Sequence, residues 1–97
     1  MRHEIILAPE AAVDLKRLKA HLRAEVKDAI EKHLRHEPMK SSKSRIKRLR
    51  GLSRPQFRLR VGEVRVFYDV SGSSVEVLAI VTKSQTEGWL REAGESK

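Results

Sequence analysis

The stretch Phe57-Arg58-Leu59-Arg60-Val61-Gly62-Glu63-Val64-Arg65-Val66-Phe67-Tyr68 predicts a β-hairpin. On both sides of Gly62-Glu63, the chain follows the two-residue period of a strand. Gly62 supplies the positive φ that a two-residue type II′ turn requires. Arg58 and Arg60 therefore share the face of the first strand that is opposite its apolar side chains, and Arg65 lies on the adjoining strand.

Further elements are predicted on both sides of this hairpin. Residues 75–82 are apolar on both faces, as in a central strand, and residues 86–93 are expected to form a short helix followed by a frayed tail. His3–Leu7 predicts an opening strand. Together with the hairpin, these segments predict a twisted, largely antiparallel sheet of four strands.

Residues 9–37 predict a helical hairpin. Apolar side chains recur about every 3.6 residues without a glycine or proline in the interior, and one unbroken helix would be roughly 40 Å long. That length exceeds a 97-residue globule, whose radius of gyration is roughly 13 Å. We therefore expect a break near Ala20 to Arg23 and an end at Pro38, after which residues 39–54 predict a connecting loop.

The fold class that follows is α+β within a single domain, residues 1–97. Its order is an N-terminal strand, a helical hairpin, a three-stranded antiparallel meander and a short C-terminal helix. The sequence has no cysteine and no apolar stretch near the roughly 20 residues of a membrane span. We therefore expect a cytoplasmic protein that has no disulfide and no membrane partner.

The net charge of +8 favours a polyanionic partner. The excess is local, because residues 39–65 contain a single acid, Glu63, whereas residues 1–38 are nearly balanced. Ten of the 21 basic residues fall in this stretch, namely Lys40, Lys43, Arg45, Lys47, Arg48, Arg50, Arg54, Arg58, Arg60 and Arg65. A solvated surface usually mixes charges of both signs, so this segregation favours a binding surface.

The chain resembles the RelE/ParE superfamily of toxins. Arg48-Leu49-Arg50-Gly51-Leu52 is similar to the family's turn into the sheet, and residues 57–68 are similar to its hairpin. Within that hairpin, the Glu-x-Arg-x-x-Tyr segment from Glu63 to Tyr68 resembles YoeB-like relatives. The resemblance extends from the opening strand to Trp89.

The resemblance implies a type II toxin that a cognate acidic antitoxin neutralises. RelE-like members cleave mRNA on the ribosome without a metal or another cofactor, whereas ParE-like members inhibit DNA gyrase. The superfamily fold does not choose between these activities. A degenerate toxin, kept only as a partner of its antitoxin, is a third reading. A small acidic protein with a DNA-binding N-terminus is expected to be encoded beside this one.

The candidate catalytic residues follow from the resemblance and from the chemistry of RNA cleavage. Metal-free cleavage needs a base for the 2′-OH, cations on the phosphate and an acid for the leaving oxygen. Arg58, Arg60 and Arg65 would hold phosphate through their planar guanidinium groups. Glu63 is the candidate base; the alternative is that it merely occupies an exposed turn. Lys83 is the candidate for the cation that acts late in the reaction.

The remaining side chains receive more modest roles. Arginine is a poor base, and Trp89 cannot donate a phenolic proton, so the acid/base set is weaker than in RelE-like nucleases. Tyr68, Phe57 and Trp89 are interpreted as packing groups, and the histidines show no metal-ligand spacing. The expected tether for ribosomal RNA comprises Lys43, Arg45, Lys47, Arg48, Arg50 and Arg54.

Overall fold

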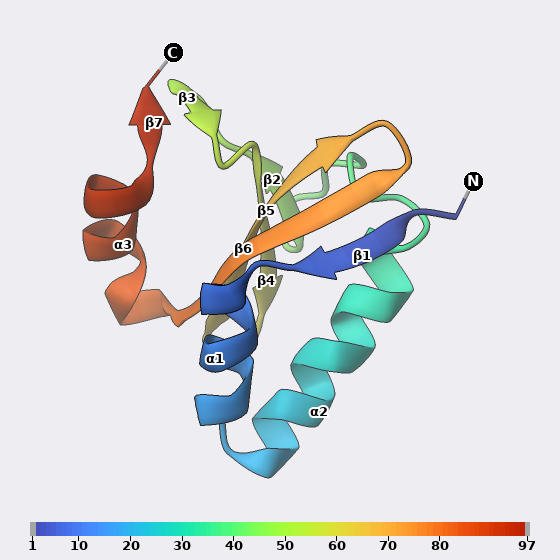
Figure 1. The fold of residues 1–97 in the computed structure, drawn as a ribbon, viewed down its shortest axis with the longest axis vertical. Coiled ribbons are helices and arrows are strands. Elements are labelled where there is room, and N and C mark those ends of the chain that lie inside the picture. The colour runs from blue at the N-terminus through green and yellow to red at the C-terminus, as the bar shows by residue number, and fades with distance from the viewer. Residues whose placement is uncertain (1, 97) are drawn as a thin grey trace.

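The computed structural model describes residues 2–96, and its main feature is a five-stranded sheet in the order β1-β6-β5-β4-β2 (Figure 1). β1 (Glu4–Leu7) runs parallel to β6, and the other neighbours are antiparallel. The meander consists of β4 (Phe57–Val61), β5 (Val64–Ser71) and β6 (Ser74–Thr82). This confirms the predicted α+β class and the predicted order of its elements.

The helical hairpin breaks two residues earlier than predicted. α1 (Pro9–Arg17) ends where Leu18 and Lys19 adopt extended backbone, and α2 (Ala20–Ala29) begins directly afterwards. Arg23 closes this corner, because its Nη2 donates to the Leu18 carbonyl at 2.9 Å. α2 continues into a π-helical turn, η1 (Ile30–Leu34), which ends before Pro38.

The core lies between this helical pair and one face of the sheet. Tyr68 and Leu59 are fully buried in it, and Tyr68 donates its hydroxyl to the Pro38 carbonyl at 2.5 Å. Phe57 stacks on Tyr68, with ring centroids 5.4 Å apart. These contacts confirm that Tyr68 and Phe57 are packing groups. The other buried members of this cluster are Ala11, Leu15, Val26, Ile30, Leu34, Ile46, Val64, Val66, Val75, Val77 and Ile80.

The opposite face of the sheet receives the C-terminal helix. α3 (Thr86–Ala93), which follows the 3-10 turn η2 (Lys83–Gln85), matches the predicted helix in its bounds. Trp89 stacks on the fully buried Phe67 of β5, with centroids 4.9 Å apart, so Trp89 is a packing group as expected. Figure 1 shows α3 separate from the α1–α2 pair.

Two segments of the predicted loop 39–54 are strands, so that part of the prediction was wrong. β2 (Ile46–Arg48) pairs with β4 and adds a fifth strand to the expected four. The reason is Ile46, which is 4% exposed and enters the core beside Leu59. β3 (Leu52–Arg54) pairs with β7 (Glu95–Ser96), so the tail that was expected to fray is a strand.

Candidate functional site: a cationic face of the sheet

Four basic side chains lie on the face of the sheet opposite the core. Lys47 of β2 is directly opposite Arg58 of β4, and Arg60 of β4 is directly opposite Arg65 of β5. Direct cross-strand partners point to the same side of a sheet. The register therefore brings the three predicted arginines together and adds Lys47, which had been assigned to the tether. We call these four residues the cationic face.

Arg58 is the most constrained of these cations. It is half-buried, and its Nε has no hydrogen-bond partner within residues 2–96. Burial lowers the pKa of Arg58, and the neighbouring charges of Arg65 and Arg60 lower it further. Arg58 also has no acidic partner among these described residues, and an anion such as phosphate would supply both the opposite charge and a hydrogen-bond acceptor.

Arg65 lies in the same face but is 8% exposed. Its Nη1 donates to the carbonyl of Gly62 at 2.7 Å and to the carbonyl of Val64 at 3.1 Å. Gly62 has a φ of +59°, as the predicted hairpin turn requires. Arg65 is thus anchored to the turn at the end of its own strand.

Glu63 and Lys83 meet at this end of the sheet. The Lys83 amide donates to the Glu63 carbonyl at 2.7 Å, and both side chains are exposed. They line an open hollow together with Thr82, Ser84 and Glu87. The candidate base and the candidate late cation therefore share one surface depression, beside the Gly62–Glu63 turn to which Arg65 is bonded.

Most of the expected tether forms an exposed basic edge. Arg45 donates from Nη1 to His33 Nε2 at 2.6 Å, and the guanidinium of Arg48 lies 5.3 Å from the ring centroid of Phe57. Lys43, Lys47 and Arg50 are also exposed. Lys47 links this edge to the cationic face, whereas Arg45 and Arg48 lie on the helical side of the sheet, against His33 and Phe57.

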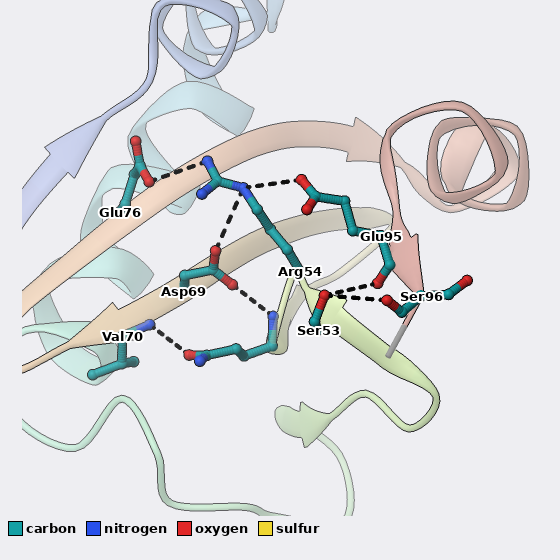
Figure 2. A network of polar contacts seen from close by, with 8 residues as sticks. Ser53, Arg54, Asp69, Val70, Glu76, Glu95 and Ser96 are labelled. Atoms are coloured by element: carbon teal, nitrogen blue, oxygen red, sulfur yellow. Dashed lines mark hydrogen bonds and ion pairs between the residues drawn. The ribbon is translucent and has the colours of Figure 1, made fainter.

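Arg54 differs from the other tether residues because acids surround it (Figure 2). It forms ion pairs with Asp69 at 3.7 Å, Glu76 at 3.3 Å and Glu95 at 4.0 Å. Burial raises the pKa of Asp69, although the hydrogen bond from the Gln56 amide and the charge of Arg54 oppose that shift. Arg54 therefore joins β3, β5, β6 and β7 and has its charge compensated within the fold.

Sequence reasoning missed the role of Phe67 in this site. Phe67 is directly opposite Arg58, is fully buried, and carries Trp89 on its ring. It shares the alternation of Arg65, so the pattern placed it on the cationic face. The alternation did not indicate that the predicted helix 86–93 covers this face and thereby buries the ring of Phe67.

No group of three or more histidine, cysteine or acidic side chains in residues 2–96 is arranged to hold a metal ion. Among these same residues, no helix is long and apolar enough to cross a bilayer.

The fold is shared with solved toxin–antitoxin structures. A chain of the RelB–RelE antitoxin–toxin complex from Methanococcus jannaschii is 23% identical, with a TM-score of 0.68 over 87% of this chain and 96% of that one. A chain of the RelBE2 complex from Mycobacterium tuberculosis is 22% identical, with a TM-score of 0.67 over 84% and 99%. A mutant of the RelE toxin from E. coli is 17% identical, with a TM-score of 0.57 over 92% of each chain. None of the curated proteins matches.

These neighbours define the class of fold, which is that of the RelE toxins. A family model described as the ParE toxin of the type II toxin–antitoxin system parDE matches residues 5–87. The chain therefore belongs to the ParE toxin family, within the RelE/ParE superfamily, and is a toxin of a type II toxin–antitoxin system.

Proposed function

We propose that this toxin blocks translation by cleaving mRNA on the ribosome, without a metal ion or another cofactor. The observation that carries the proposal is Arg58, which lies between Lys47 and the Arg60–Arg65 pair. Its guanidinium is partly buried and has no acidic partner among residues 2–96. Such a site favours a phosphodiester backbone, because planar guanidinium groups can contact two phosphate oxygens at once.

The proposed chemistry uses the cationic face and the hollow that Glu63 and Lys83 line beside it. Arg58 and Arg60 hold the scissile phosphate and offset the charge that develops on it in the transition state. Glu63 takes the proton from the 2′-OH, whose oxygen bonds to phosphorus as the bond from phosphorus to the 5′ oxygen breaks. The exposed ammonium of Lys83 stabilises the negative charge on that leaving oxygen, which takes its proton from water. The hollow that Glu63 and Lys83 share supports this division of labour.

The exposed basic edge would bind ribosomal RNA. Lys43, Arg45, Arg48 and Arg50, together with Lys47 where the edge meets the cationic face, provide exposed positive charge. Such charge suits contacts with the phosphate backbone, which add affinity without selecting a sequence. We further propose that an acidic antitoxin neutralises the toxin, as the RelB–RelE complexes among its neighbours suggest. The mRNA target would place its action in the cytoplasm.

The test is cleavage of mRNA on stalled ribosomes by the purified toxin. Primer extension should show new ends with the wild-type protein, and Arg58→Ala should reduce their rate of formation by at least tenfold, on the scale of a lost charged contact. Arg91→Ala, which removes an exposed arginine from α3, is the matched control and should cleave at the wild-type rate. Intact mRNA with the wild-type protein would rule out the nuclease.

The second candidate is inhibition of DNA gyrase. Two observations favour it: the family model is that of the ParE toxins, and the cations nearest the proposed phosphate site are mostly arginines, which are poor bases. In this case the cationic face would bind gyrase or its DNA. Inhibition of supercoiling by the purified toxin, with intact ribosomal mRNA, would decide for this function.

A further inference from the structure

Arg60 and Arg65 are direct cross-strand partners with different surroundings. Arg60 is exposed, whereas Arg65 is nearly enclosed between Arg60 on β4 and Val81 on β6. The Nη1 of Arg65 already donates to two carbonyl groups of its own turn. The two arginines thus lie on the same face and each carries one positive charge. Of the two, only Arg60 presents its side chain freely to a ligand.

The carbonyl groups that Arg65 holds are those on either side of Glu63. Arg65 donates to the Gly62 and Val64 oxygens, and the Lys83 amide donates to the oxygen of Glu63 itself. Three consecutive carbonyl groups of the turn therefore have donors from outside the turn or from the Arg65 side chain. The backbone that carries the Glu63 carboxylate is held on both sides.

We propose that Arg65 is a positioning residue, which fixes the Gly62–Val64 turn so that the Glu63 carboxylate and Lys83 keep their places in the shared hollow. Arg58, Arg60 and Lys47 are then the phosphate ligands of the cationic face. This inference rests on the proposed nuclease function. It assigns the predicted cations two different tasks, according to whether their donors are free or already bonded to backbone.

The first experiment compares Arg60→Gln with Arg65→Gln, since each substitution removes one positive charge from the same cross-strand pair. Binding to a single-stranded RNA oligomer with 2′-O-methyl groups, which the toxin cannot cleave through the 2′-OH, is measured by fluorescence anisotropy over a range of salt concentrations. Arg60→Gln should reduce the slope of log K against log salt by about 0.7, the value for one phosphate contact on a single strand. Arg65→Gln should leave the slope unchanged, and an equal loss in both variants would overturn the proposal.

The second readout is hydrogen exchange at the Lys83 amide, which is bonded to the Glu63 carbonyl. Loss of the Arg65 contacts should speed its exchange, whereas Arg60→Gln should not. Arg65→Lys should restore part of the protection, because an ammonium group can still donate to one of the two carbonyl groups. Unchanged protection in Arg65→Gln contradicts the assignment.

A third measurement uses the wild-type protein and does not depend on how well Arg65→Gln folds. Arginine Nε–H signals are followed by NMR while the same oligomer is added; those of Arg58 and Arg60 should shift, and that of Arg65 should stay in place. A shift of Arg65 equal to that of Arg60 would overturn the proposal.

Cleavage kinetics separate this inference from the proposed function. On ribosomes, Arg65→Gln should lower kcat with little change in KM, whereas Arg60→Gln should raise KM. If the wild-type protein neither binds RNA nor cleaves mRNA, the proposed function fails. Faster Lys83 exchange in Arg65→Gln would then still support the role of Arg65 in the turn, and unchanged exchange would remove that role as well.

Discussion

At the scale of single residues, several polar side chains hold backbone groups that the sheet leaves unpaired. Asp14 on α1 accepts from the Ile80 amide at 3.0 Å. β1 pairs with β6 only as far as Val77, so the Ile80 amide lies beyond the paired part of that edge. A buried amide without an acceptor costs about 1–3 kcal/mol, which the Asp14 carboxylate avoids. Arg65 acts in the opposite sense, by supplying donors to carbonyl groups.

His33 gives the fold a pH dependence that can be measured. Its Nε2 must be unprotonated, because the guanidinium of Arg45 can only donate. Burial lowers the pKa of His33 from its ordinary 6.5, and the charges of Arg45 and Lys32 lower it further, against the opposing charge of Asp28. A lowered pKa means that the folded state disfavours the protonated form. The contribution of neutral His33 to the free energy of unfolding is therefore complete above the ordinary pKa and is lost as the pH falls below it.

We accordingly expect His33→Gln to flatten the pH profile of stability. The glutamine amide oxygen can still accept from Arg45 but does not titrate. Urea unfolding between about pH 8 and about pH 5 should show the wild type losing stability relative to the variant towards acid pH. The variant keeps the other histidines, so the difference between the two curves isolates His33. Parallel curves would contradict this prediction.

At the scale of elements, the C-terminal segment depends on the close approach of β7 to α3. A Cβ on Gly94 would lie 2.5 Å from the Leu90 carbonyl oxygen, which backbone atoms cannot tolerate without moving. Ser53 Oγ donates to the carbonyl of Glu95 at 3.2 Å, so this approach also places β7 on β3 (Figure 2). Gly94 is therefore required for the geometry of the last strand.

Gly94→Ala is expected to detach β7 from β3, whereas Gly88→Ala is expected to stabilise α3. A Cβ on Gly88 meets nothing within 4 Å, and alanine is favoured over glycine inside a helix by about 0.5–1 kcal/mol. Limited proteolysis and thermal unfolding of the two variants give the comparison. Gly94→Ala should be cleaved faster near its C-terminus and Gly88→Ala more slowly, and identical cleavage rates would argue against a docked β7.

At the scale of the whole molecule, the positive charge is divided between compensated and free cations. Arg54 is surrounded by Asp69, Glu76 and Glu95, whereas Arg50 is exposed and forms no ion pair within residues 2–96. The two arginines lie close together in sequence. Net charge alone therefore overstates what is available to a polyanion.

Arg50→Ala and Arg54→Ala should separate binding from stability. Arg50→Ala is expected to lower the salt slope of RNA binding by about 0.7 and to leave stability unchanged. Arg54→Ala should leave the slope unchanged and reduce the free energy of unfolding by about 1 kcal/mol, because its ion pairs are largely solvent-exposed. Fluorescence anisotropy and urea unfolding on the same protein samples measure both effects. A reduced slope in Arg54→Ala would place that residue in the binding surface after all.

The sequence predicted those parts of the fold whose signal lies in neighbouring residues. The alternation in residues 57–68 predicted the hairpin and the face that carries Arg58, Arg60 and Arg65. The bounds of α3 were predicted, and the helical hairpin was predicted with a small error in its break. β2 escaped prediction because Ile46 is a single apolar residue in a basic run, and only its burial beside Leu59 makes it a strand residue.

The sequence by itself therefore determined the α+β order, the basic character of the stretch 39–65 and the face on which its strand arginines lie. Only the tertiary structure decided which of those arginines are free. Arg65 is enclosed and bonded to its own turn, and Arg54 is paired with three acids. Arg58 is partly buried and has no acidic partner in the described part of the chain. The physical reason is range: alternation is set by adjacent residues, whereas burial and charge pairing depend on segments far apart in the chain.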